Sequence, residues 1–281
     1  MAKKIKVCLD AGHYGKYNRS PAVSDYYESD MTWKLHKLLK ESLEAFGIEV
    51  ITTRAKKKED MPLLARGRAS KGCDLFLSLH SNAVGNRVDN SVDRVDIYAP
   101  LNGKAHDLAR RLADAIVQVM GTRQRGYVKT REGSHGNDYY SVIQGATEVG
   151  TPGLLIEHSF HTNLTSALWL MDDVNLEMLA SAEAAVIADY YGLFSDKPTE
   201  PAEPVKMGDR SLVKGMAGPD VRELKHALIK LGYSAADDVF DVELELAVNA
   251  FKADCGLEVN GKAGCGVFRR LAEMLADEEG E

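Results

Sequence analysis

Apolar and polar positions alternate with a period of two at the start of the chain. Ile5, Val7 and Leu9 are separated by more polar or smaller residues, and this pattern predicts a strand with two different faces. Gly12 then ends the run, and His13 follows it directly. The first predicted strand therefore delivers a histidine at its carboxyl end.

The next segment changes to helical spacing, with apolar residues every three or four positions between Glu28 and Phe46. Gly47 stands where a helix commonly ends in a left-handed residue. The alternation continues to about residue 191, with further predicted strands at 47–54, 74–82, 92–100 and 152–160 and predicted helices at 61–72, 108–119 and 175–191. This order predicts an α/β fold in which a mostly parallel twisted sheet is flanked by helices on both faces.

A change of composition divides the chain. Residues 195–206 contain three of the eight prolines among charged and small residues, and such a segment favours an extended spacer. Beyond it, three apolar runs at helical spacing, at 221–231, 244–251 and 268–275, predict a small three-helix domain. The expected organisation is a first domain at 1–194, a linker at 195–208 and a second domain at 209–281.

The charge balance argues against nucleic acid as a partner. Residues 1–194 contain 24 basic and 24 acidic side chains, and residues 195–281 contain 11 and 18, which accounts for the net charge of −7. No basic face emerges from either part.

Hydropathy argues against membrane insertion, because no run approaches the ~18–20 apolar residues that a spanning helix needs. The first apolar run also differs from a secretory signal peptide, since Lys6 interrupts it and Asp10 ends it. We therefore expect synthesis in a bacterial cytoplasm without a signal peptide.

Candidate chemistry lies at the predicted carboxyl ends of strands, where open α/β sheets bind ligands. His13, His80 and Glu157 each follow or end an apolar strand, and Glu28 falls in the first turn of a helix, where the dipole favours a carboxylate. Two imidazoles and one carboxylate are the ligand set of a catalytic zinc, and a second carboxylate serves as an acid–base group. Taken singly, a histidine at a strand end is more often a satisfied polar side chain than a ligand, Glu28 fits a helix-start acid and Glu157 fits a salt-bridge partner. The four together make the functional interpretation about as good as the structural one.

Several spaced motifs carry a family resemblance. They are D-A-G-H (10–13), the helix that starts at Glu28, I-T-T-R (51–54), L-L-A-R-G-R-A-S (63–70), F-L-S-L-H-S-N-A (76–83) and P-G-L-L-I-E-H-S-F-H-T-N (152–163). Over roughly residues 3–194 the chain resembles the zinc-dependent N-acetylmuramoyl-L-alanine amidases of amidase type 3. The segment from G-P-D-V-R-E-L-K (218–225) to G-L-E-V-N-G-K-A-G (256–264) is similar to the three-helix peptidoglycan-binding domain.

The resemblance implies that His13, Glu28 and His80 bind one Zn²⁺ and that Glu157 is the catalytic carboxylate. It also implies peptidoglycan as partner and the amide between N-acetylmuramic acid and L-alanine of the stem peptide as substrate. Two alternatives remain open: a zinc peptidase that cuts within the stem peptide, and a wall-binding protein without activity. With no signal peptide expected, a phage endolysin that reaches the wall after release is the favoured biological role. The sequence predicts no oligomeric state.

Substrate contacts are expected from four side chains around these residues: Asn82, His161, Tyr139 and Tyr140. The two tyrosines belong to the Gly-rich polar segment 130–142, which is equally consistent with an ordinary surface loop. His158 departs from the usual family segment, and we expect it to face away from Glu157 with a structural role. We expect His36 and His106 to be solvated on polar helix faces.

Overall fold

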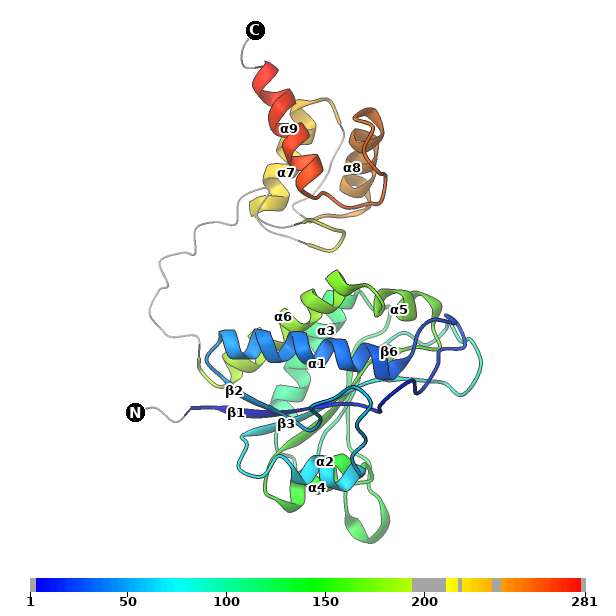
Figure 1. Ribbon diagram of the computed structural model, residues 1–281, viewed down its shortest axis with the longest axis vertical. Helices are drawn as coiled ribbons and strands as arrows, with labels where there is room; N and C mark the ends of the chain where they lie inside the picture. Colours follow the sequence, from blue (N-terminus) through cyan, green and yellow to red (C-terminus); the bar gives the residue numbers. More distant parts are fainter. Residues whose placement is uncertain (1–3, 194–210, 217–218, 234–238, 279–281) are drawn as a thin grey trace. The chain divides into compact units, whose positions relative to one another are not determined.

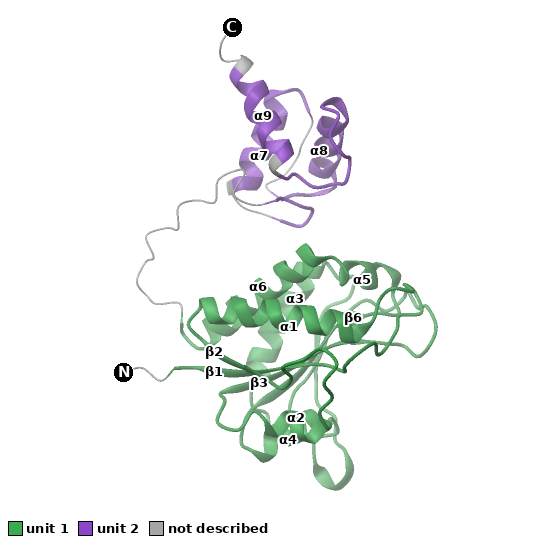
Figure 2. Ribbon diagram, viewed as in Figure 1, with its two compact units in different colours: residues 1–194 green, residues 195–281 purple. Residues whose placement is uncertain are grey.

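The computed structural model describes residues 4–193, 211–216, 219–233 and 239–278. The chain forms two compact units, Met1–Phe194 and Ser195–Glu281, coloured separately in Figure 2. The predicted linker at 195–208 lies outside the described residues.

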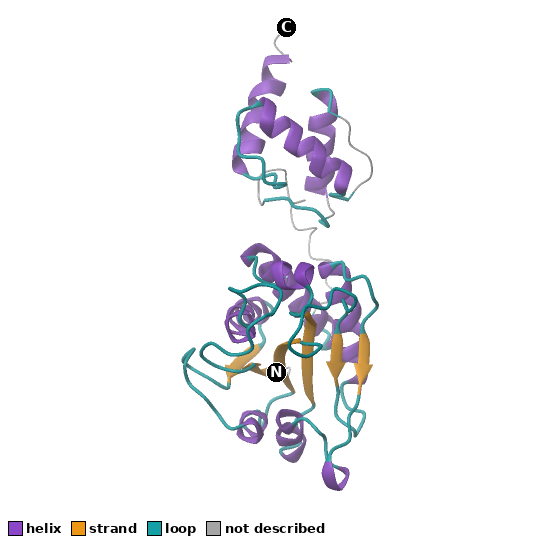
Figure 3. Ribbon diagram, turned by 90° about the vertical axis from the view of Figure 1, so that its right-hand side faces the viewer, coloured by secondary structure: helices purple, strands orange, loops and turns teal. Residues whose placement is uncertain are grey.

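Six strands form one sheet in the first unit, in the order β2-β1-β3-β6-β4-β5. Their bounds are β1 Lys6–Ala11, β2 Glu49–Thr52, β3 Leu75–Asn82, β4 Asp96–Tyr98, β5 Tyr127–Lys129 and β6 Gly153–Phe160. Every neighbouring pair is parallel except β4 and β6, which run antiparallel. The predicted mostly parallel sheet is confirmed, and Figure 3 shows its strands between two layers of helices.

Helices cover both faces of this sheet (Figure 1). One face carries α1 (Glu28–Ala45), α3 (His106–Met120) and α6 (Asp173–Tyr190), and the other carries α2 (Leu63–Arg68) and α4 (Ser141–Glu148). The larger apolar core, which includes Leu35, Leu77 and Leu112, lies under the first group. A smaller core with Phe76 and Ile143 lies under the second. Side chains of β3 therefore pack into both cores, because successive residues of a strand point to opposite faces of the sheet.

The sequence pattern missed β5, α4, α5 (Leu164–Trp169) and the single 3₁₀ turn Ser134–Gly136. Strands and turns of three residues are too short to show a period. Helix α4 is hidden because it contains Gly145, and glycine is a poor helix former. Gly145 and Gly67 let α4 and α2 touch backbone to backbone, since a Cβ atom at these positions would lie 2.2 Å from the Leu64 carbonyl oxygen and 2.1 Å from the Val142 carbonyl oxygen, respectively.

The second unit contains α7 (Pro219–Lys230), α8 (Val242–Asp254) and α9 (Cys265–Glu278), so the predicted three-helix arrangement is confirmed. Its buried apolar residues come from all three helices and from the segments that precede them; they include Leu212, Val221, Leu224, Phe240, Leu244, Phe251, Ala263 and Leu271. A bridge between Leu212 and Ala263 closes the unit. Within the described parts of the chain, no helix combines the length and the apolar character needed to cross a membrane.

Candidate active site

The four polar residues that the sequence places at strand ends come from the centre of the sheet. His13 lies two residues after β1, His80 lies near the end of β3, Glu157 lies within β6, and Glu28 is the first residue of α1. Strands β1, β3 and β6 are parallel neighbours. Their carboxyl ends share one edge of the sheet, which is where α/β folds bind ligands.

Gly12 allows β1 and β3 to approach each other closely at this edge. A Cβ atom at position 12 would lie 2.5 Å from Cε1 of His80 and 2.5 Å from the carbonyl oxygen of Leu79. His13 follows with a φ of 58°, a left-handed conformation that residues with side chains adopt rarely. Any larger residue at position 12 would displace the His80 ring, which explains the glycine of the D-A-G-H motif.

Glu28 lies between the two histidines. Its Oε2 is 3.2 Å from Nε2 of His13, and its Oε1 is 2.8 Å from Nδ1 of His80. Burial alone would raise the pKa of Glu28, but the hydrogen bonds from His13 and His80 outweigh this effect and hold the pKa well below its usual value. Glu28 is therefore a carboxylate in the folded protein.

This cluster suits a divalent metal ion. One nitrogen of each histidine and one oxygen of Glu28 all lie within 4.8 Å of one another. Glu28 is only 1% exposed, and among the described residues its ion-pair partners are histidines alone, without a lysine or arginine. A buried carboxylate needs a positive partner, and a metal ion held by two imidazoles and this carboxylate would supply it.

Two further groups hold Glu28, and sequence analysis predicted neither of them. The side-chain amide of Asn18 donates to Oε2 of Glu28 at 2.7 Å and lies 3.1 Å from Nε2 of His13. The backbone N–H of Ser81 donates to Oε1 at 3.1 Å, next to a register shift in the β3–β6 pair. Such contacts orient the carboxylate, as outer partners of metal ligands commonly do.

Glu157 lies beside this cluster, and its pKa is shifted in the opposite direction from that of Glu28. It pairs in register with His80 of β3 on one side and with Asp96 of β4 on the other. Burial first, and then the negative charges of Glu28 and Asp96, raise the pKa of Glu157 well above its usual value. Its Oε2 is buried without a hydrogen-bond partner in the described structure. A carboxyl group of this kind can both take up and release a proton.

Asp96 is a second acidic neighbour that sequence analysis missed. It is 1% exposed, and it pairs with Nε of Arg94 at 3.1 Å and with Nζ of Lys129 at 2.8 Å. Two cations therefore contact this carboxylate beside Glu157. The sequence indicates only that Asp96 lies on a predicted strand. It does not show that this strand pairs with β6.

His161 and Asn82 lie at the margin of the cluster. Nδ1 of His161 is 4.0 Å from Oε2 of Glu28 and 3.0 Å from the carbonyl oxygen of Ser81, and the ring stacks on Tyr26. His161 also lines a cavity of about 550 Å³. Its backbone N–H donates to the carbonyl oxygen of Asn82 at 2.8 Å. Both residues are within reach of a ligand at the cluster, and their contact with substrate stays a prediction.

Tyr139 and Tyr140 occupy a different place. Tyr139 is 48% exposed, with Arg131 3.5 Å above its ring centroid. Tyr140 is half-buried and packs on Tyr98, two residues after Asp96 on β4, with ring centroids 4.5 Å apart. In the described structure no ring contact joins Tyr139 or Tyr140 to His13 or His80, and their substrate contacts also stay predictions. Tyr140 is near Glu157, since burial first, then the contact with Tyr98, and also the charge of Glu157 raise the pKa of Tyr140.

Three other histidines, His158, His36 and His106, are at least half-buried. His158 is fully buried on the opposite face from Glu157, as expected, with Nδ1 donating to the His80 carbonyl oxygen at 2.9 Å and Nε2 2.7 Å from Oε1 of Glu183. The prediction of a solvated His36 is wrong, since it is 4% exposed and its burial lowers its pKa to about 4. His106 is half-buried at the start of α3 rather than fully solvated.

A buried ion pair supports the loop that carries His13. Asp10 is fully buried, and its carboxylate is 3.3 Å from Nη1 of Arg66 and accepts hydrogen bonds from the hydroxyl groups of Thr53 at 2.6 Å and Ser78 at 2.7 Å. The same guanidinium group reaches the carbonyl oxygen of His13 at 3.4 Å. The pair therefore ties the first strand to the loop that follows it.

Replacing Arg66 with methionine is expected to lower the unfolding free energy by about 3–5 kcal/mol, because it leaves the Asp10 carboxylate buried without its cation. Urea denaturation measures this loss. The matched control is Arg68→Met, which removes an exposed ion pair with Glu148 and should change stability by less than about 1 kcal/mol. Equal losses in the two variants would contradict the assignment.

Fold and site together define a class of protein: an α/β enzyme with a candidate metal centre and a neighbouring acid at the carboxyl edge of its sheet. The family profile described as N-acetylmuramoyl-L-alanine amidase matches residues 7–189, which is well over half of the chain. The chain belongs to this family and is a peptidoglycan amidase. A second profile, for a peptidoglycan binding domain, matches residues 217–271.

Solved structures agree with the fold. AmiC2, an N-acetylmuramoyl-L-alanine amidase of Nostoc punctiforme, is similar at 24% identity over 68% of this chain and 99% of its own, with a TM-score of 0.57. An N-acetylmuramoyl-L-alanine amidase from Clostridium difficile 630 is similar at 23% identity over 68% of this chain and 99% of its own, with a TM-score of 0.55. Cwp6 from Clostridium difficile is 25% identical over 67% of this chain, which covers 30% of that longer protein, with a TM-score of 0.57. A comparison with curated protein sequences gives no match.

Proposed function

We propose that this amidase is zinc-dependent and cuts the amide between N-acetylmuramic acid and L-alanine, with His13, Glu28 and His80 as the metal ligands and Glu157 as the catalytic carboxylate. The convergence of the first three side chains on one point, with Glu157 beside them, is the observation that carries this proposal. Two imidazoles and one carboxylate favour zinc, and such a ligand set leaves a fourth position for water or substrate.

When bound, zinc acts as a Lewis acid on the scissile carbonyl and makes a bound water acidic near neutral pH. The chain's own residues carry out the proton transfers. Glu157 takes the proton of the attacking water on its unpartnered Oε2 and then delivers it to the leaving nitrogen of L-alanine. Its raised pKa lets the carboxyl group hold that proton between the two steps.

The second unit supports a lytic role. A domain that cuts peptidoglycan and a domain that binds it are matched on one chain, at residues 7–189 and 217–271. We propose 1–194 as the catalytic domain, 195–208 as the linker and 209–281 as the wall-binding domain of an endolysin. Purified protein added to bare cell walls is expected to clear the suspension, and removal of residues 209–281 is expected to reduce the bound fraction.

Identifying the reaction products tests the proposal. Digestion of defined walls by the zinc-loaded chain should release new L-alanine amino termini and leave lactyl carboxylates on the sugar. A chelator should stop the release, and added Zn²⁺ should restore it. Mass spectrometry of the fragments supplies the measurement.

Other products would overturn the proposal in identifiable ways. New amino termini further along the stem peptide would indicate a zinc peptidase, and reducing sugar ends would indicate a glycosidase. Bound protein with intact walls would indicate a wall-binding protein without activity. Activity that survives a chelator that has removed all metal would exclude the zinc mechanism.

A further inference from the structure

We propose that a lysine-lined cavity beside His13 is an anion subsite that binds a carboxylate of the stem peptide, beyond the amide that is cut. This inference rests on the proposed function, because it places the leaving peptide next to the candidate metal cluster. The cavity measures about 510 Å³ and is lined by Tyr14, Gly15, Lys16, Asp30, Lys57 and Lys58.

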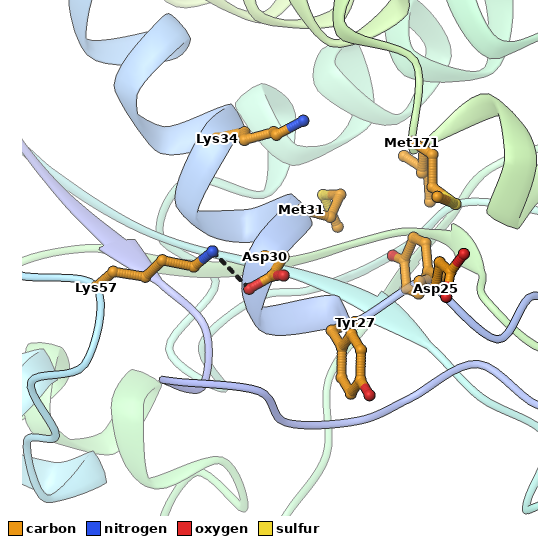
Figure 4. A pocket seen from close by; sticks show the side chains of 9 residues that line it. Asp25, Tyr27, Asp30, Met31, Lys34, Lys57 and Met171 are labelled. Carbon is orange, nitrogen blue, oxygen red and sulfur yellow. Dashed lines mark ion pairs between the residues drawn. The ribbon is translucent and has the colours of Figure 1, made fainter.

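The charge of this cavity is opposite to that of the whole protein. Three of its lining residues are lysines and only Asp30 is acidic, so the lining carries a net charge of +2, whereas the chain carries −7. Lys57 is already paired with Asp30, with 2.8 Å between Nζ and Oδ1. Figure 4 shows this pair from the neighbouring pocket, with the Lys57 ammonium group directed at the Asp30 carboxylate. Lys16 and Lys58 are the two positive charges left for a ligand.

Within the described structure, neither of these two lysines forms an ion pair. The Lys16 ammonium group lies 4.9 Å from the centroid of the Tyr27 ring, a contact that does not neutralise its charge. Lys58 is exposed. Exposed lysines are ordinarily scattered, but here two of them line one concave surface beside Tyr14. That arrangement attracts a small anion.

Buried side chains hold the two loops that form the cavity. The backbone N–H of Gly15 donates to the carbonyl oxygen of Lys57 at 3.2 Å, which joins the loops directly. Arg54, 3% exposed, donates to the same carbonyl oxygen at 2.9 Å. Ser29, 1% exposed, donates to the carbonyl oxygen of Gly15 at 2.9 Å and accepts from the N–H of Tyr17 at 2.8 Å. The lysines therefore project from a preorganised backbone.

The cavity is linked to the candidate active site by chain adjacency and by stacked rings. Tyr14 follows His13 in the chain and stacks on Tyr17 with ring centroids 6.2 Å apart, and Tyr17 stacks on His13 at 5.1 Å. Ser29, which holds the loop, is the residue after Glu28. A carboxylate on the second residue of the stem peptide lies about 7 Å beyond the scissile bond, and a lysine side chain three positions after His13 can meet it at that distance.

Paired substrates test the subsite. Two muropeptides are compared that differ only at the second stem residue, with a free carboxylate in one and a primary carboxamide in the other. For the zinc-loaded full chain carrying Lys16→Gln and Lys58→Gln together, KM for the carboxylate substrate should rise about five- to tenfold, because each exposed ion pair contributes only a few fold. The kcat value, and KM for the carboxamide substrate, should change less than about twofold.

The matched control is Lys71→Gln. Lys71 is exposed just before β3, at the opposite edge of the sheet from the site, and its replacement changes the net charge in the same direction. This variant should leave both KM values unchanged. A control that behaved like the double variant would mean that overall charge, and not the cavity, controls binding.

A second measurement does not depend on catalysis. Titration calorimetry with the two free stem peptides should show tighter binding of the carboxylate form, and the double variant should remove that preference. Equal binding of the two peptides, or equal KM changes for the two substrates, would overturn the subsite while leaving the amidase proposal intact. Failure to cut either substrate would instead overturn the proposed function, and the calorimetry would still decide the subsite.

Discussion

Replacing Glu157 with glutamine is expected to lower kcat on wall substrates by at least about 10²–10⁴-fold, because glutamine cannot carry the proton from water to the leaving nitrogen. The side chain keeps its size, so bound zinc should remain at one ion per chain. Dye release from labelled walls measures turnover, and elemental analysis measures zinc. Turnover within tenfold of the wild-type protein would show that another group moves the proton.

The same substitution should stabilise the metal-free protein at neutral pH. Burial and the charges of Glu28 and Asp96 raise the pKa of Glu157 above its usual 4.5, so the folded state binds this proton more tightly than the unfolded chain does. The unfolding free energy of the metal-free wild-type protein therefore falls as the pH rises above 4.5, and the glutamine variant lacks this loss. The stability advantage of the variant should disappear at more acidic pH. Glu177→Gln, an exposed change on α6, is the matched control and should show no such pH dependence.

Replacing His80 with alanine is expected to remove zinc and activity together. His80 supplies one of three clustered ligand atoms, and its loss leaves an incomplete ligand set. Changes to groups that only hydrogen-bond to a metal ligand already reduce metal affinity about 10–100-fold, so loss of a direct ligand should exceed that range. Zinc content after dialysis, together with the increase in melting temperature on adding zinc, measures the effect.

The control for this variant is His226→Ala, an exposed histidine on α7 of the second unit. It should retain a full equivalent of zinc and normal turnover. If His80→Ala still bound one zinc tightly, the ligand set proposed here would be wrong even with activity lost.

Local patterns in the sequence predicted the parts of the fold that depend on nearby residues. The alternation of Leu75, Leu77 and Leu79 predicts β3, and the D-A-G-H motif brings His13 to the end of β1, because both depend on the period of one strand. The family resemblance assigned roles to these residues. Those roles remain proposals, while the structure brings the side chains of the proposed metal site together.

Local patterns could not predict that Asn18 and Asp96 belong to the site, for a physical reason. Asn18 contacts Glu28 only because the loop before α1 folds back on itself, as the bridge between Arg19 and Tyr27 shows. Asp96 lies beside Glu157 only because β6 inserts between β3 and β4. Strand order and loop paths are set by long-range packing, which no local period records.

The position of β6 has a consequence for synthesis on the ribosome. Among the six strands of the sheet, β6 is the last to be translated, yet it lies between β3 and β4. A nascent chain that ends before residue 153 therefore holds two separate strand groups with unpaired edges, which are prone to aggregate until they are joined. The strand that joins these two groups also brings Glu157, so an unfinished chain has neither a complete sheet nor the acid that cutting the wall requires.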